Sequence, residues 1–338
     1  MSPRPGRPSR VGAVLALALA AVVVAVLAVV LTGKDDDAPG STPDPMPTSA
    51  PVTPTPTSTP SSAAPSSEPA APAVPAVPPE QDYPRLPEEC ASREEKIPQE
   101  PGACFLDEFV EDRPTVVLWG DSHAWQHIPV LRAAVGEEQV NLVAFVMGSC
   151  PPMDLDLPAG EGTKCEQNAT AALDYISRLD REGRPLKVVL GAYWRFYLDV
   201  LADPAGYRDY DQQQAELFAE FTPQAMRALG RAGIDTDVIA QTVSVPDPAP
   251  CAAPYACRIP RADALREEVA TDAWVREAMR PLGGSARYLD PNGDICDETW
   301  CYGRREGIYT FFDQQHLTAT RSRTLLPLFA DVVADVLP

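Results

Sequence analysis

Five short apolar runs alternate with longer amphipathic stretches in the C-terminal two thirds of the chain. The runs have the length and β-branched content of strands buried on both faces, and they span residues 115–119, 140–147, 187–190, 235–241 and 286–289. The stretches after them have apolar residues at helical spacing, and they span residues 124–135, 165–181, 211–232, 262–280 and 318–336. Strands that alternate with helices predict an α/β domain whose parallel sheet is covered on both faces.

The N-terminal pattern differs. Residues 1–10 hold three arginines and no acid, and residues 11–32 form an uncharged run of Val, Ala and Leu. At 1.5 Å per residue this run is long enough to cross a bilayer, and it is longer than the apolar core of most cleaved signal peptides, which is the alternative interpretation. Arginines before the run and Asp35-Asp36-Asp37 after it predict a cytoplasmic tail, a transmembrane anchor and an extracytoplasmic remainder.

Residues 33–82 are rich in Pro, Ser, Thr and Ala. Fourteen of the 46 residues from Asp35 to Glu80 are proline, too many for a helix or strand, and the apolar mass is too small for a core. We therefore predict a disordered linker that acts as an extended tether. Residues 83–338 are then left as one folded domain.

A strand-to-helix junction falls at Gly120-Asp121-Ser122. Gly120 permits a sharp turn, and a serine at this point lies at the carboxyl edge of the sheet, where open α/β folds keep their sites. Free N–H groups at the start of the following helix can hold a developing oxyanion. Ser122 is thus a candidate nucleophile, although a serine before a helical run more commonly only caps the helix.

Asp313 and His316 lie three residues apart, just before the last helical stretch. A serine hydroxyl needs a base to become nucleophilic, and the base needs a partner on its other ring nitrogen to fix the tautomer. The other two histidines fit less well, because His123 adjoins the serine and His127 lies in the helix that follows it. We interpret His316 as the base and Asp313 as its partner; a strand order 2-1-3-4-5 brings both to the serine.

Gly120-Asp121-Ser122-His123 together with Asp313-x-x-His316-Leu317 resembles the SGNH (GDSL) hydrolase superfamily. The resemblance is greatest to extracytoplasmic SGNH domains fused to acyltransferase family 3 membrane proteins, and it covers residues 90–338. It implies a flavodoxin-like three-layer sandwich with a five-stranded parallel sheet. It also implies that Ser122 is the nucleophile, His316 the base and Asp313 the orienting acid of a cofactor-free acyl transfer or ester hydrolysis.

The oxyanion hole departs from the pattern of the superfamily. Most SGNH hydrolases complete it with a glycine after the second strand and an asparagine after the third. Gly148 supplies the first donor through its backbone N–H, beside that of Ser122. The third strand, however, ends Leu190-Gly-Ala-Tyr-Trp194, without an asparagine.

Four residues beside the two strand ends are candidate substrate-binding residues: Asp121, His123, Trp194 and Arg195. Aromatic rings in this region can stack on sugar rings, and two more tyrosines follow at Tyr207 and Tyr210. Arg195 can pair with an anionic substrate. The alternative is that such residues only pack in the core or in loops, as they more often do.

All eight cysteines follow the predicted membrane span, and an even number in an exported domain is typical of disulfides. Sequential pairing is the simplest arrangement: Cys90 with Cys104, Cys150 with Cys165, Cys251 with Cys257, and Cys296 with Cys301. We predict no metal site. The chain lacks a CxxC pair and has only three histidines, which disfavours zinc, and the segment from Asp290 to Asp297 lacks the closing glutamate of a calcium loop.

The formal net charge is −20, from 48 acidic and 28 basic residues. This charge argues against nucleic acid and against docking on anionic lipid, so membrane association is assigned to the anchor alone.

These features predict a membrane-anchored, extracytoplasmic enzyme that transfers or hydrolyses an O-acyl group, most simply acetyl, on cell-envelope carbohydrate through an acyl-serine. Water as the acceptor makes it an esterase, and a sugar hydroxyl makes it a transferase. With one predicted span, a transferase is expected to work with a separate multispanning membrane acyltransferase. The alternative is a non-catalytic binding or assembly module on the same scaffold. A lipase or thioesterase is disfavoured because no long apolar segment lies near the site.

Overall fold

A computed structural model of the chain defines the structure of residues 77–158, 160–245 and 257–337. The predicted tail at 1–10, the predicted span at 11–32 and nearly all of the predicted linker lie outside these residues. Within the three described ranges, none of the helices is long and apolar enough to cross a membrane. The transmembrane anchor therefore stays a prediction.

Six strands form the central sheet in the order β1-β3-β2-β4-β5-β7. Their bounds are β1 Cys104–Phe105, β2 Thr115–Gly120, β3 Asn141–Val146, β4 Leu186–Gly191, β5 Asp235–Ile239 and β7 Tyr288–Leu289. The last five are parallel and have the predicted order, with β2 between β3 and β4. The prediction of a purely parallel five-stranded sheet was wrong, because β1 adds an antiparallel edge strand to β3. β1 has only two residues, too few to show a period in the sequence.

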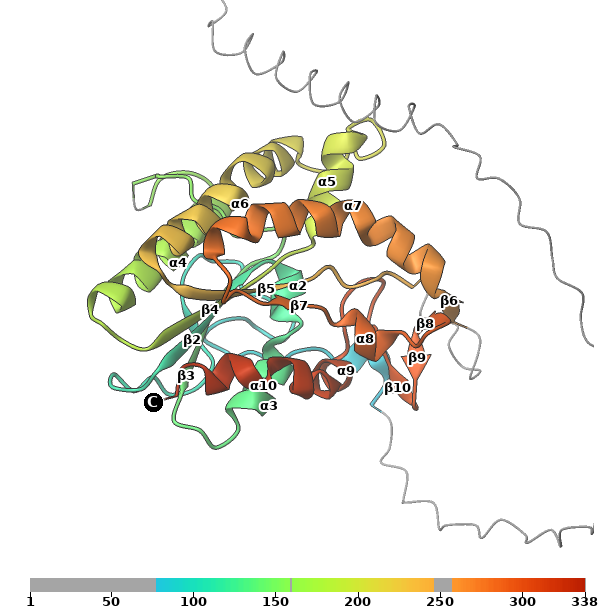
Figure 1. Cartoon of the computed structure of the whole chain (residues 1–338), viewed down its shortest axis with the longest axis horizontal. Coiled ribbons are helices and arrows are strands. Elements are labelled where there is room, and N and C mark those ends of the chain that lie inside the picture. Colours follow the sequence, from blue (N-terminus) through green and yellow to red (C-terminus); the bar gives the residue numbers. More distant parts are fainter. Residues whose placement is uncertain (1–76, 159, 246–256, 338) are drawn as a thin grey trace, which may run out of the picture. The chain divides into compact units, whose positions relative to one another are not determined.

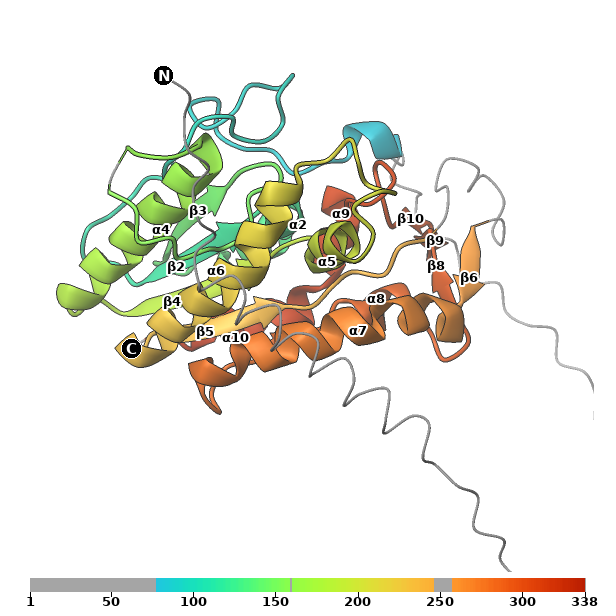
Figure 2. The same cartoon turned by 90° about the horizontal axis from the view of Figure 1, so that it is seen from above.

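Helices cover both faces of the sheet, which gives three layers (Figures 1 and 2). One face carries α4 Lys164–Arg181, α5 Trp194–Ala202, α6 Gln212–Ala232 and α7 Arg261–Met279, and the other carries α3 Ile128–Val135, α9 Ala319–Thr324 and α10 Leu326–Ala334. Side chains of β2 alternate between the two cores. Val116 and Leu118 join the core on the α3 and α10 side, whereas Val117 and Trp119 join the core on the α4 and α6 side.

Two helices predicted as continuous are interrupted. The stretch after β2 forms α2 Ser122–Trp125 and then α3, and the last stretch forms α9 and then α10. In both cases a proline, Pro129 or Pro327, lies in the first turn of the second helix. A proline has no N–H to donate to the preceding turn, so a new helix begins there.

The remaining described elements are short. They are η1 Pro79–Gln81, η2 Arg280–Leu282, α8 Asn292–Ile295, β6 Arg258–Pro260, β8 Trp300–Tyr302, β9 Arg304–Arg305 and β10 Ile308–Tyr309. β6 pairs with β8 and β9 pairs with β10, both antiparallel. η1 belongs to the end of the predicted linker, and this end already contacts the domain: the carbonyl of Asp82 accepts a 2.8 Å hydrogen bond from Ala319 N in α9.

Three of the four predicted disulfides are confirmed: Cys90–Cys104, Cys150–Cys165 and Cys296–Cys301. The fourth predicted pair includes Cys251, which lies outside the described residues, so it stays a prediction.

A buried ion network joins the strands at the amino end of the sheet. The side chain of Lys187 in β4 is 1% exposed and lies 2.9 Å from Asp235 and 3.1 Å from Asp237, both in β5. It also lies 3.1 Å from Asp335, just after α10. Arg287, before β7, contacts Asp237 at 2.6 Å and Asp335 at 2.7 Å. These ion pairs therefore hold β4, β5, β7 and the C-terminal helix together at the end of the sheet opposite its carboxyl edge.

Candidate active site

Ser122 lies at a turn that only a glycine permits. β2 ends at Gly120, and a Cβ there would lie 1.7 Å from the carbonyl oxygen of Gly191 at the end of β4. The chain then turns into α2, whose first residue is Ser122. The carboxylate of Asp121 caps this helix by accepting a 2.7 Å hydrogen bond from His123 N. The serine hydroxyl is thus presented at the carboxyl edge of the sheet.

His316 reaches Ser122 from the loop between β10 and α9. Its Nδ1–H donates to Asp313 Oδ2 at 2.8 Å, and its Nε2 accepts from Ser122 Oγ at 2.7 Å. We assign the proton to Nδ1 because an ionised carboxylate can only accept. Burial raises the pKa of Asp313, but hydrogen bonds from the His316 ring and from the N–H groups of Gln315 and His316 outweigh it, so the net direction is down. Asp313 therefore stays ionised beside the imidazole.

Three rings surround the imidazole of His316. Phe312 stacks on it with centroids 5.7 Å apart, and Trp125 meets it edge-on at 6.0 Å. His123 lies 5.0 Å away on a tilted plane. Packing and the bond to Asp313 together fix the direction in which Nε2 points.

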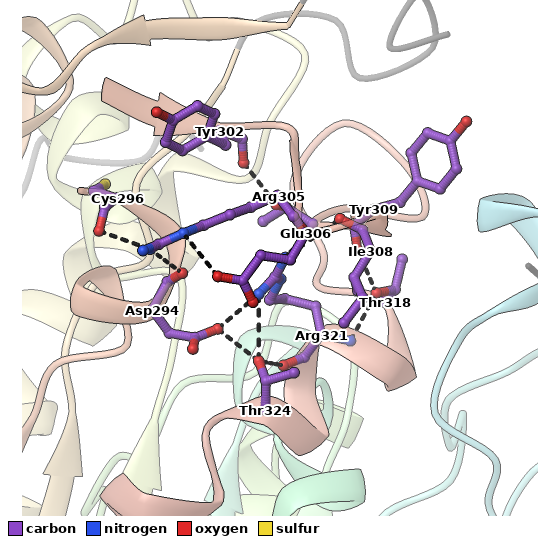
Figure 3. A network of polar contacts seen from close by, with 11 residues as sticks. Asp294, Cys296, Tyr302, Arg305, Glu306, Ile308, Tyr309, Thr318, Arg321 and Thr324 are labelled. Carbon is purple, nitrogen blue, oxygen red and sulfur yellow. Dashed lines mark hydrogen bonds and ion pairs between the residues drawn. The ribbon is translucent and has the colours of Figure 1, made fainter. Parts of the chain in front are cut away.

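A polar network anchors the chain on both sides of this loop (Figure 3). The guanidinium of Arg321 in α9 is buried; it donates to Asp294 Oδ2 at 2.9 Å and to the carbonyl of Arg305 at 2.8 Å. Arg305 in turn donates to the Asp294 carbonyl at 2.8 Å. Thr318, the N-cap of α9, donates to the Tyr309 carbonyl at 2.7 Å. These hydrogen bonds therefore hold together the two ends of the loop that carries His316.

Asp121 joins the serine turn to the loop after β4. Its Oδ2 accepts from Tyr193 N at 2.9 Å and from the Tyr197 hydroxyl at 2.7 Å. Burial raises the pKa of Asp121, and these hydrogen bonds together with the one from His123 N oppose the rise. Both oxygens are thus engaged inside the protein. Asp121 therefore positions the serine turn, and it also lines the cavity beside Ser122, so its predicted contact with substrate stays a prediction.

Residues 89–331 match the family described as the SGNH domain fused to AT3 domains, which is more than half of the chain. The chain belongs to this family. The resemblance seen in the two sequence motifs is thereby confirmed. None of the curated proteins matches the sequence of the chain. Among solved structures, the lipopolysaccharide acetyltransferase periplasmic domain of Salmonella ser. Paratyphi A is similar at a TM-score of 0.44 and 14% identity, over 67% of this chain and 85% of that one.

Other predicted substrate-binding residues of the SGNH domain lie away from solvent or are already paired. Trp194 is fully buried and donates through Nε1 to the Ile239 carbonyl at 2.8 Å, which favours the alternative that it packs in the core. Arg195 contacts three carboxylates, at 2.7 Å to Glu267, 3.1 Å to Glu268 and 3.2 Å to Asp199. Its charge is therefore neutralised within the SGNH domain, and it does not line the cavity beside Ser122.

The two remaining histidines are neutral. His123 is buried and stacks on Tyr193 with centroids 4.1 Å apart. Burial holds its pKa well below the usual range, and repulsion from His316 and His127 when they are protonated acts in the same direction. It forms part of the packing around His316, and its ring does not line the cavity beside Ser122. His127 stacks on Phe329 in α10, and burial lowers its pKa to about 3.

A cavity of about 250 Å³ opens beside Ser122 in the SGNH domain. One side of it is an aromatic wall made of four residues: Tyr193, Phe196, Tyr207 and Tyr210. Tyr193 stacks on Phe196 at 5.6 Å, and Tyr210, which is 55% exposed, meets Phe196 edge-on at 4.8 Å. These aromatic residues are visible in the sequence, but their position on one side of a cavity is not. The wall forms because α5 packs against the turn before α6.

The two predicted oxyanion donors are backbone N–H groups at the carboxyl edge of the sheet. Among the described residues, neither Ser122 N nor Gly148 N donates a hydrogen bond to the protein. Gly148 follows β3, next to the cavity-lining Ser149, whose backbone is left-handed with φ 56°. The same described residues contain no cluster of three or more His, Cys, Asp or Glu side chains able to hold a metal ion.

Proposed function

We propose that the SGNH domain of this chain is a serine-dependent acyltransferase or esterase. Ser122 acts as the nucleophile, His316 as the general base and Asp313 as the acid that orients it. The observation that carries the proposal is the continuous set of hydrogen bonds from Asp313 through His316 to Ser122, at 2.8 and 2.7 Å. A serine that merely capped α2 would need neither partner.

The chemistry follows from this geometry. As Ser122 Oγ attacks the carbonyl carbon of an O-acyl ester, His316 Nε2 takes its proton, and Asp313 stabilises the imidazolium. The N–H groups of Ser122 and Gly148 hold the oxyanion. The intermediate collapses to acyl-serine, and the imidazolium returns the proton to the departing alcohol. A hydroxyl of the acceptor then attacks the acyl-serine as His316 takes its proton, and the imidazolium returns this proton to the departing Ser122 Oγ.

We further propose that the acceptor is a carbohydrate and that the acyl group is acetyl. The aromatic wall supports a sugar, because ring faces bind the apolar faces of pyranoses and a tyrosine adds a polar tip. A cavity of about 250 Å³ suits a small acyl group with one sugar unit better than a long chain. Three disulfides support an extracytoplasmic location.

Ser122 needs a donor for the acyl group that it transfers. Because this family is described as fused to AT3 domains, we propose that a membrane acyltransferase of that type delivers the acyl group to Ser122 from a separate chain. The predicted anchor at 11–32 and the linker at 33–82 would hold the SGNH domain near such a partner at the outer face of the membrane.

The proposal is tested with p-nitrophenyl acetate and the full chain in neutral detergent. Release of p-nitrophenol and of acetate is followed with and without an oligosaccharide acceptor. Ser122→Ala is expected to lower both rates by at least about 10³-fold, whereas Ser177→Ala on α4, remote from the cavity, leaves them unchanged. Release of p-nitrophenol in excess of acetate when acceptor is present marks transfer; equal release marks hydrolysis. Equal rates in wild type and Ser122→Ala would reject the serine mechanism and favour a binding module.

A further inference from the structure

Five basic side chains gather around Tyr83 in an otherwise acidic protein. Two adjoining hollows, of about 370 and 240 Å³, share Tyr83 and Arg85 in their linings. We call them together the basic hollow; its basic residues are Arg85, Arg93, Lys96, Arg132 and Arg323. Glu88 is the only acidic residue in either lining. The hollow thus has a local positive charge that the composition of the chain does not suggest.

These cations lack carboxylate partners. Across residues 77–158, 160–245 and 257–337, no ion pair forms between any of the five and an acidic side chain. By contrast, Arg195 contacts three carboxylates and Arg287 contacts Asp237, Asp331 and Asp335. With 48 acidic residues in the chain, five unpaired cations in one place are available to an anion from outside the protein.

Three of the five cations, Arg85, Lys96 and Arg132, are held in place by contacts with the protein. The Arg85 guanidinium lies 3.9 Å above the Tyr83 ring, and the Lys96 ammonium lies 4.8 Å from the same ring. Arg132 donates to the Arg85 carbonyl at 3.2 Å. Lys96 has a left-handed backbone with φ 63°, which costs energy for a residue with a Cβ. The contacts of Arg85, Lys96 and Arg132 limit the movement of these three side chains in the hollow.

The basic hollow adjoins the loop that carries the base. The ring of Tyr83 packs on Phe312 at 5.9 Å, and Phe312 stacks on His316 at 5.7 Å. Lys96 lies 5.6 Å from the Phe312 ring. None of the residues that line the hollow lines the cavity beside Ser122. The basic hollow is therefore separate from the cavity beside Ser122, and two ring contacts, Tyr83 with Phe312 and Phe312 with His316, link it to the base.

We propose that the basic hollow is a subsite for an anionic group, a phosphate or a carboxylate, of the same glycan whose hydroxyl is acylated at Ser122. The proposal rests on the proposed function in naming the glycan as ligand. An anionic polymer fits because the hollow adjoins the loop that carries His316, and because phosphate and carboxylate match the guanidinium groups of Arg85 and Arg93. A lipid surface fits less well, since none of the lining residues is among the large apolar side chains exposed on the described part of the chain.

The test measures binding by titration calorimetry on the full chain in neutral detergent, so it does not depend on turnover. The probes are an oligogalacturonate, the uncharged galactose oligosaccharide of equal length, inorganic phosphate, and vesicles containing phosphatidylglycerol. The expected result is binding of the oligogalacturonate but not of the neutral oligosaccharide, with competition by phosphate and with affinity that falls as salt is raised. Ser122→Ala should bind equally well, which separates this result from failure of the proposed function.

Matched double variants locate the site. Arg93→Gln with Arg323→Gln removes two charges whose side chains make no hydrogen bond or ion pair within the described residues, so the fold should be unaffected. It is expected to weaken oligogalacturonate binding about tenfold. Arg178→Gln with Arg266→Gln removes the same charge from α4 and α7 and should leave the affinity unchanged. Equal weakening by both pairs, binding of the neutral sugar alone, binding of free phosphate alone, or binding of vesicles alone would each overturn the proposal.

Discussion

The hydroxyl of Tyr197 donates a 2.7 Å hydrogen bond to the buried carboxylate of Asp121. Tyr197 lies in α5 and Asp121 in the turn after β2, so the bond ties the serine turn to the segment where the sequence lacks the expected asparagine. The same carboxylate accepts from Tyr193 N at 2.9 Å. The position of Ser122 therefore depends on a tyrosine that touches neither the serine nor the base through a hydrogen bond.

Tyr197→Phe removes this donor and keeps the ring. The free energy of unfolding is expected to fall by about 1–2 kcal/mol, because a buried carboxylate loses one of its three donors. kcat for p-nitrophenyl acetate is expected to fall about tenfold through a displaced Ser122. Tyr288→Phe is the matched control, since its hydroxyl donates to Asp272 far from the serine. The positioning role would be rejected by a variant that loses stability and keeps the kcat of the wild type.

The aromatic wall makes a prediction about the acceptor. Tyr210 is 55% exposed at its rim, so Tyr210→Ser should raise KM for an oligosaccharide acceptor about 2- to 10-fold, the range expected for loss of one ring contact. Hydrolysis of p-nitrophenyl acetate, which needs no sugar, should stay unchanged, and Tyr210→Trp should restore KM. A change in both reactions, or in neither, would contradict a role of Tyr210 in sugar binding.

Local patterns in the sequence predicted the five parallel strands and the residues that meet at the carboxyl edge, and the strand order followed from the need to bring those residues together. A buried strand that ends at Gly120 and a helix that begins at Ser122 are both visible within ten residues. The Asp313-x-x-His316 spacing is equally local, and the parallel order then brings the two segments together. The helix bounds were close for the same reason; α4 at Lys164–Arg181 differs from the predicted range by one residue.

Long-range partners explain what the sequence did not predict. Trp194 is buried because its Nε1–H finds the Ile239 carbonyl at the end of β5, 45 residues away. Arg195 donates a hydrogen bond to Glu268 on α7, 73 residues away. The basic hollow combines residues from the segment before β1, from α3 and from α9. The spacing of apolar residues within one segment gives no information about contacts between distant segments.

The buried ion network predicts a large effect on stability. Lys187→Met leaves Asp237, which is fully buried, with Arg287 as its only remaining basic contact, and it removes the partner of Asp235. The free energy of unfolding in urea is expected to fall by about 3 kcal/mol. The control is Lys164→Met, which breaks an exposed pair with Glu100 and should change stability by less than about 1 kcal/mol. Similar losses in both variants would contradict the structural role of the network.

Glu268 predicts a pH dependence of stability. Burial raises its pKa from an ordinary 4.5 to about 7, even though Arg195 opposes the rise. The folded state therefore binds a proton that the unfolded state releases, so its contribution to stability is complete below pH 4.5 and is lost as pH rises through 7. Glu268→Gln should consequently gain in Tm over the wild type as pH goes from 4.5 to 8.

The control for this pH effect is Glu267→Gln, which contacts the same Arg195 from an exposed position. Its gain in Tm over the wild type between pH 4.5 and 8 should be smaller than the gain of Glu268→Gln. Equal gains in the two variants, or no gain for Glu268→Gln, would show that Glu268 does not retain its proton in the folded state.

The acyl group on Ser122 is the most direct measure of the proposed mechanism. The full chain is mixed with p-nitrophenyl acetate, stopped in acid within the first turnovers and digested, and the peptide that contains Ser122 is analysed by mass spectrometry. The mechanism predicts one added acetyl group on Ser122 in the wild type, reduced by addition of an oligosaccharide acceptor and absent from His316→Ala. An unmodified Ser122 during active turnover, or equal acetylation in His316→Ala, would contradict it.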